Sequence, residues 1–138
     1  MRKRESERIL VVDSDTEFRR SLIKTLLRAG YKVSSVSGEV KAKELISMKT
    51  YSLILIDPHM HNSSALELLK HVREKSPSSK VIIVSANGGL DMDSKALEAG
   101  AFAFLHKPVK RETLLNHIAR ALKTRGEVAV DGRRIAHV

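Results

Sequence analysis

The sequence predicts a doubly wound α/β fold, in which one five-stranded parallel sheet carries helices on both faces. Strand-length aliphatic segments alternate along the chain with segments of helical periodicity. Three of the aliphatic segments, ILVV, LILI and VIIV, show almost no polar alternation, which is typical of strands buried on both faces. A chain of 138 residues with 42% hydrophobic content is long enough for one such domain.

The expected strands and helices follow one another in strict alternation. The strands cover residues 8–13, 31–37, 51–57, 80–86 and 101–108. The helices cover residues 16–30, 38–50, 64–76, 90–100 and 110–126. Gly30 and Gly100 stop two of the helices, and Pro77 ends a third. Right-handed crossovers then restrict the topology to a few doubly wound strand orders.

Apolar spacing also predicts which faces of the first two helices are buried. The first helix gathers its apolar residues on one side: Phe18, Leu22, Leu26 and Ala29. The second helix is shorter, and its expected apolar residues are Val40, Leu45 and Met48. We expect these two sets to pack against the sheet.

Polar residues stand where the carboxyl ends of the expected strands meet. In chain order they are Asp13, Asp57, Ser85 with Ala86, and Lys107 with Pro108. In open α/β sheets, ligands bind outside this edge. A carboxylate at the end of a strand can also cap the next helix. Asp57 lies too far upstream of its helix for that role, so its position favours chemistry.

These groups suit a hard cation and a transferred phosphoryl group. Mg²⁺ takes oxygen ligands and keeps several waters, so two carboxylates and one backbone carbonyl suffice. A phosphoryl group on Asp57 would be neutralised by the Lys107 ammonium and hydrogen-bonded by the Ser85 hydroxyl. The sequence shows neither a nucleophile paired with a base nor a P-loop, which argues against a hydrolase or a nucleotidase.

The motifs ILVVDSD, LILIDPHM, VIIVSA and EAGAFAFLHKP occur in order, and the segment 8–124 that contains them resembles the receiver domains of two-component response regulators. The resemblance implies a flavodoxin-like sheet with strand order 2-1-3-4-5. It further implies a phosphoryl donor, either a histidine kinase or a phosphotransfer protein. No enzymatic activity is implied beyond the domain's own phosphoryl acceptance and hydrolysis.

The resemblance also implies a role for each residue of the site. Asp57 is the phosphoacceptor, and Mg²⁺ is held by Asp13, Asp57 and the backbone carbonyl of His59. The implied phosphate-binding residues are Ser85, Ala86 and Lys107.

Two further residues have implied roles in switching and in structure. Phe104 stands where receivers carry an aromatic that turns inward when the hydroxyl residue, here Ser85, moves toward the phosphate. Pro108 follows Lys107 through a bond that is typically cis in this family. The implied partner surface comprises the fourth helix, fifth strand and fifth helix, and it would bind an output domain, a target protein or a second copy of the chain.

The chain departs from the receiver pattern at the acidic pair, where Asp13 is followed by Ser14 instead of a second acid. The missing acid contacts the metal directly in the family, so we expect Ser14 to be a weak or absent ligand and Mg²⁺ binding to be weakened. Ser14 and Glu17 form an S-x-x-E pattern, which predicts a capping box for the first helix. His59 and His61 in a later loop could bind zinc or nickel, although polar surface is the commoner role of such residues.

Composition limits the other classes of function. The net charge of +9 lies mostly at the ends, since residues 1–8 carry four bases and two acids and residues 107–138 carry eight bases and three acids. Aromatic content of 4% offers no stacking platform for single strands, so we expect no nucleic-acid binding by this segment; a DNA-contacting fragment that uses the basic ends is the weaker alternative. We also expect no membrane span and no secretory signal, and the lack of cysteine is consistent with the cytoplasm.

Three segments are expected: a basic extension over residues 1–7, a receiver domain over 8–124, and a linker or the start of a truncated output domain over 125–138. Asp131 and Gly132 predict a hairpin turn in the last segment. Two functions stay open. The first is a phosphorylation-gated switch, and the second is an atypical receiver that binds proteins without phosphorylation.

Overall fold

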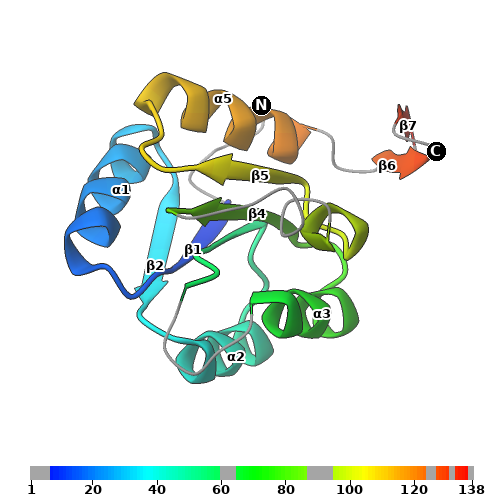
Figure 1. The fold of residues 1–138 in the computed structure, drawn as a ribbon, viewed down its shortest axis with the longest axis horizontal. Helices are drawn as coiled ribbons and strands as arrows, with labels where there is room; N and C mark the ends of the chain where they lie inside the picture. The colour runs from blue at the N-terminus through cyan, green and yellow to red at the C-terminus, as the bar shows by residue number, and fades with distance from the viewer. Residues whose placement is uncertain (1–6, 60–64, 87–94, 124–126, 131–132, 137–138) are drawn as a thin grey trace.

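A computed structural model describes residues 7–59, 65–86, 95–123, 127–130 and 133–136 (Figure 1). The strands are β1 (Arg8–Val12), β2 (Lys32–Val36), β3 (Leu53–Ile56), β4 (Lys80–Ser85), β5 (Ala103–His106), β6 (Glu127–Val130) and β7 (Arg133–Ala136). The helices with described bounds are α1 (Thr16–Arg28), α2 (Glu39–Met48), α3 (Ala65–Lys75) and α5 (Arg111–Lys123).

The main sheet has five parallel strands in the order β2-β1-β3-β4-β5. The predicted α/β class and strand order are therefore confirmed. In the central strands Ile9 pairs with Leu53, and Ile54 pairs with Val81. The aliphatic residues of β1, β3 and β4 are all buried, which explains why these stretches contain no polar residue.

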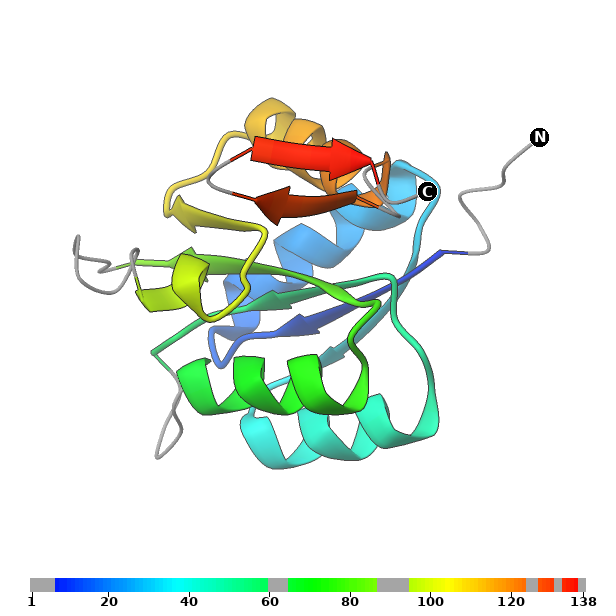
Figure 2. The ribbon, with the colours of Figure 1, turned by 90° about the vertical axis from the view of Figure 1, so that its right-hand side faces the viewer.

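Alternating residues of each strand face two separate hydrophobic cores. Leu10 and Val12 point to a core that includes α2 and α3, whereas Ile9 and Val11 point to a core that includes α1 and α5. Figures 1 and 2 show these two helix pairs on opposite sides of the sheet. The sheet is thus covered on both faces, and its carboxyl edge is left to carry polar groups.

The first helix begins differently from the capping-box prediction. Its N-cap is Asp15, whose side chain accepts a hydrogen bond from the backbone N–H of Phe18 at 3.1 Å. Ser14 is therefore not the cap, and that prediction was wrong. Ser14, Asp15 and Thr16 are all good N-cap types, and the helix starts one residue later than the capping box requires.

The buried face of α2 was predicted correctly only at Leu45, which packs against the core that includes α2 and α3. Val40 and Met48 are 74% and 72% exposed, while Ala42 and Ile46 are buried. Both faces of this ten-residue helix carry apolar residues, so periodicity alone does not choose between them. In α1, by contrast, Leu22 and Leu26 are buried as predicted.

The remaining predicted elements are described in part. Of the helix expected over 90–100, residues 95–98 are helical and Ala99 and Gly100 form the turn that follows, whereas residues 90–94 lie outside the described residues. The predicted hairpin is confirmed by the antiparallel pairing of β6 with β7, although its turn lies outside the described part of the chain. Along the described residues, no helix combines the length and the apolar character that a membrane span needs.

Candidate functional site

Two carboxylates lie side by side at the carboxyl edge of the sheet because parallel pairing carries β1 and β3 to the same level. The backbone N–H of Asp13 donates to the carbonyl of Val36, and that of Asp57 donates to the carbonyl of Val12. Asp13 is 2% exposed and Asp57 is 6% exposed. The site therefore holds two acids that are largely removed from water.

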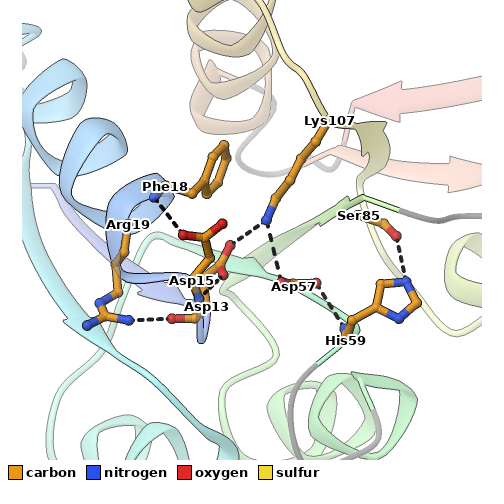
Figure 3. Close-up of polar contacts among 8 residues, drawn as sticks. All are labelled: Asp13, Asp15, Phe18, Arg19, Asp57, His59, Ser85 and Lys107. Carbon is orange, nitrogen blue, oxygen red and sulfur yellow. Dashed lines mark hydrogen bonds and ion pairs between the residues drawn. The ribbon is translucent and has the colours of Figure 1, made fainter.

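A single ammonium group serves both acids. The Nζ atom of Lys107 lies 3.0 Å from Oδ2 of Asp13 and 3.5 Å from Oδ2 of Asp57 (Figure 3). The backbone N–H of Lys107 donates to the carbonyl of Ser85, which fixes the lysine at the end of β5 beside β4. One positive charge faces two negative charges, so the cluster keeps a negative excess that a cation would neutralise.

The aromatic ring of Phe18 helps to hold the ammonium group. Nζ of Lys107 lies 4.0 Å from the centre of this ring, within the range of a cation–π interaction. Phe18 is placed there by the N-terminal turn of α1, which Asp15 caps. The sequence predicted only packing for Phe18, because its helical spacing gives no sign of a contact with residue 107.

Asp13 is tied to the start of α1 by local hydrogen bonds. Its Oδ1 atom accepts from the N–H of Asp15 at 2.8 Å, and its carbonyl accepts from Nη1 of Arg19 at 2.6 Å. Burial raises the pKa of the Asp13 carboxyl above its ordinary value, and this effect outweighs the lowering by the Asp15 N–H and by Lys107. Asp57 adds to the increase through repulsion between like charges.

His59, in the loop after β3, links Asp57 to Ser85. Oδ1 of Asp57 accepts from the backbone N–H of His59 at 2.9 Å. The imidazole Nε2 of His59 lies 3.1 Å from Oγ of Ser85 (Figure 3). The sequence suggested a metal-binding role for the His59 imidazole and, through the resemblance, for its backbone carbonyl, but it could not reveal this side-chain contact between residues 26 positions apart.

The other predicted residues surround this cluster. Ser14 is partly exposed and Ala86 is exposed at the end of β4. Phe104 packs against the core on the α2 and α3 side, and its ring lies 5.1 Å from that of His106. Pro108 is exposed and follows a cis peptide bond, as predicted. His61 lies outside the described residues.

The donor set of the edge is made of oxygen atoms. Among the residues that the structure describes, no three His, Cys, Asp or Glu side chains come close enough to form a complete metal cluster. The converging carboxylates of Asp13 and Asp57 nevertheless suit Mg²⁺, which takes few protein ligands and completes its shell with water. Such a site accommodates an oxygen-rich anion next to the cation.

Comparisons with known proteins agree with this geometry. The family model described as the response regulator receiver domain matches residues 9–119. This chain belongs to that family of receiver domains. It is thus a receiver domain of the two-component response regulator family. Receiver domains typically bind a divalent metal ion.

Relatives resemble the chain over most of its length. The response regulator protein PilR of Pseudomonas aeruginosa is 34% identical over 131 residues, which cover 92% of this chain and 29% of PilR. The chain spans about a quarter of the length of the curated relatives that it matches.

Solved structures share the fold. A CheY-like receiver domain protein from Methanospirillum hungatei is 30% identical with a TM-score of 0.83, and the match covers 86% of this chain and 95% of that one. The beryllofluoride-activated dimer of the NtrC4 receiver domain is 30% identical with a TM-score of 0.81, and the match covers 84% of this chain and 96% of that one.

Proposed function

We propose that Asp57 is the residue that accepts the phosphoryl group. Its carboxylate ends a buried central strand, and its Oδ2 atom lies 3.5 Å from the ammonium of Lys107. That ammonium shared between two acids is the observation that carries the proposal, because it supplies positive charge where a phosphoryl group would add negative charge. Transfer forms a bond between phosphorus and Asp57 as the phosphorus–nitrogen bond of the donor histidine breaks.

Asp13, Asp57 and the backbone carbonyl of His59 would hold Mg²⁺. When bound, the ion supplies neutralisation of the charge on the transferred group. Ser14 replaces the acid that usually contributes a further ligand, so the acidic pair is atypical and we expect Mg²⁺ to bind more weakly than at a site with three carboxylates.

Ser85, Ala86 and Lys107 would bind the phosphoryl oxygens, through a hydroxyl, a backbone N–H and an ammonium respectively. Ser85 and Phe104 would carry the switch, since they lie on the neighbouring strands β4 and β5, where Ser85 pairs with His106 and Phe104 pairs with Ile83. The helix expected over 90–100, β5 and α5 would form the surface whose partner binding changes when the switch changes state. Pro108 would hold the turn that follows Lys107.

The whole protein would extend beyond this domain. We propose that residues 8–124 form the receiver, that 1–7 are a basic extension and that 125–138 lead toward an output domain. A histidine kinase or a phosphotransfer protein would be the donor, in the cytoplasm. A dimer is also proposed, supported by the similarity to the NtrC4 receiver, which forms a dimer when activated by beryllofluoride.

Beryllofluoride, which mimics a phosphoryl group on a carboxylate, tests this function. We expect the full chain with Mg²⁺ and beryllofluoride to show changed amide resonances at Ser85, Phe104 and α5, and Asp57→Asn to show none. Equal spectra for the parent with and without beryllofluoride would contradict the proposal. That result would favour a receiver that binds its partner without phosphorylation, with Lys107 as a permanent counterion of the two acids.

A further inference from the structure

The side chain of His59 reaches across the site to the hydroxyl of Ser85. Its Nε2 atom lies 3.1 Å from Oγ of Ser85, and its backbone N–H donates to Oδ1 of Asp57 at 2.9 Å. The second bond fixes the start of the loop against the acid, and the first directs the imidazole toward β4 (Figure 3). One residue therefore contacts both the proposed phosphoacceptor and the proposed switch hydroxyl.

The register of the sheet brings Ser85 and Asp57 to the same edge. Ile56 pairs with Ile83 in the parallel strands β3 and β4, so Asp57 and Ser85 each lie just beyond that pair. Ser85 has no exposed surface, whereas His59 is exposed. The hydroxyl is thus buried, and the imidazole that contacts it belongs to a more exposed residue.

The hydroxyl of Ser85 can donate only one hydrogen bond. A serine side chain carries one proton to donate, and phosphoryl oxygens only accept hydrogen bonds. If Ser85 donates its proton to Nε2 of His59, that proton is not available to the phosphoryl group. If Nε2 donates to Ser85 instead, the bond still holds Oγ 3.1 Å from the imidazole. In that second case Ser85 keeps its proton for the phosphoryl group, so the two groups compete for the proton when Nε2 is the acceptor.

We propose that His59 is a positioning residue that holds the Ser85 hydroxyl in its unphosphorylated place, so that the phosphoryl group on Asp57 must compete with the imidazole for it. This inference rests on the proposed function. The hydrogen bond from Ser85 to the phosphoryl group then stabilises the activated state less, because the hydrogen bond to His59 is lost when it forms. A smaller fraction of phosphorylated protein is therefore in the activated state. The imidazole acts on the switch through Ser85 and not by contact with the transferred group.

A double-mutant cycle measures this competition. The apparent affinity for beryllofluoride, at saturating Mg²⁺ and one fixed, mildly alkaline pH, is compared among the parent, His59→Ala, Ser85→Ala and the double variant. We expect His59→Ala to tighten binding by about threefold to tenfold, which corresponds to the net contribution of one neutral hydrogen bond. In the Ser85→Ala background the same substitution should leave the affinity unchanged. The Mg²⁺ affinity of each variant is measured first without beryllofluoride, and the saturating Mg²⁺ concentration is set from it, so that the cycle compares beryllofluoride binding alone.

The contact itself is tested without beryllofluoride by the nitrogen resonances of the His59 ring in the full chain. We expect the Nε2 resonance to shift in Ser85→Ala, because its partner is removed. An unchanged resonance would overturn the proposal at its first step. The proposal would also be overturned if His59→Ala raised the affinity for beryllofluoride equally in the parent and in the Ser85→Ala variant, or raised it in neither case.

Failure of the proposed function has a different signature. If the Nε2 resonance shifts in Ser85→Ala but the parent binds no beryllofluoride, the contact exists while Asp57 is not a phosphoacceptor. The positioning role is then rejected together with the phosphoacceptor. A shifted Nε2 resonance, together with a gain in beryllofluoride affinity that depends on Ser85, supports both the phosphoacceptor role of Asp57 and the positioning role of His59.

Discussion

The two edges of the sheet bury polar groups in opposite ways. At the amino edge, before β3 and β4, the hydroxyls of Ser76 and Ser79 lie 2.7 Å apart and Ser79 donates to the carbonyl of Tyr51 at 2.5 Å. At the carboxyl edge, Asp13 and Asp57 share the one ammonium of Lys107. The first network is neutral and its hydroxyls are satisfied within the protein, while the second keeps an unbalanced charge.

The difference indicates what each edge contributes. A satisfied neutral network fixes the chain and needs no ligand. A buried pair of acids with one counterion is costly for folding, and the pKa of Asp13 is raised accordingly. Residues that destabilise a fold in this way are common at functional sites. We therefore assign stability to the amino edge and phosphoryl chemistry to the carboxyl edge.

The largest expected effect comes from removing the shared counterion. Lys107→Met should lower the free energy of unfolding at neutral pH by roughly 2 to 4 kcal/mol, because two buried carboxylates lose the ammonium group that they share. It should also weaken the response to beryllofluoride. Urea unfolding checks the first effect. The control Lys110→Met, at an exposed neighbour, should cost less than about 0.5 kcal/mol, and equal losses in the two variants would argue against a special role for Lys107.

The amino edge should respond in stability alone. Ser79→Ala removes the group that links Ser76 with the Tyr51 carbonyl, so we expect a loss of about 1 to 3 kcal/mol in unfolding free energy and unchanged beryllofluoride affinity. Ser78→Ala, one residue earlier and exposed, is the matched control and should be near neutral. A changed affinity in Ser79→Ala would show that the two edges are coupled, contrary to the comparison.

An added acid should sharpen the contrast between the edges. Ser14→Asp is expected to tighten Mg²⁺ binding by about tenfold, because it adds a carboxylate next to Asp13. The stability of α1 should be preserved, since Asp15 and not Ser14 caps the helix. Titration calorimetry measures the affinity, with Thr16→Asp as a control that adds the same charge nearby. If both variants gain equally, the effect is general electrostatics and Ser14 does not face the metal site.

The smallest effect is a dependence of stability on pH. The pKa of Asp13 is higher in the folded protein than its ordinary value of 3.8, so the folded state binds the proton more tightly and the charged form opposes folding. Asp13→Asn should therefore be more stable than the parent above the folded pKa, and this advantage should disappear as the pH falls below 3.8. Urea unfolding across the acidic range checks it; an advantage independent of pH would show that Asp13 ionisation is not its source.

The sequence revealed the fold and the site skeleton because both depend on short local signals. Uninterrupted aliphatic strands predicted the parallel sheet, and the strand ends predicted that Asp13, Asp57, Ser85 and Lys107 would meet at one edge. Details that depend on tertiary context were missed. Neighbouring cap candidates competed at Ser14 and Asp15, two apolar faces competed in α2, and the contact of His59 with Ser85 joins distant positions.

The measurement that most directly tests the phosphoryl chemistry of the carboxyl edge is intact mass after incubation with acetyl phosphate, with and without Mg²⁺. We predict one added phosphoryl group that requires Mg²⁺ in the parent. It should be absent in Asp57→Asn and present in Asp15→Asn, whose asparagine still caps α1. A folded parent that gains no phosphoryl group at high Mg²⁺, or an adduct that persists in Asp57→Asn, would contradict the account.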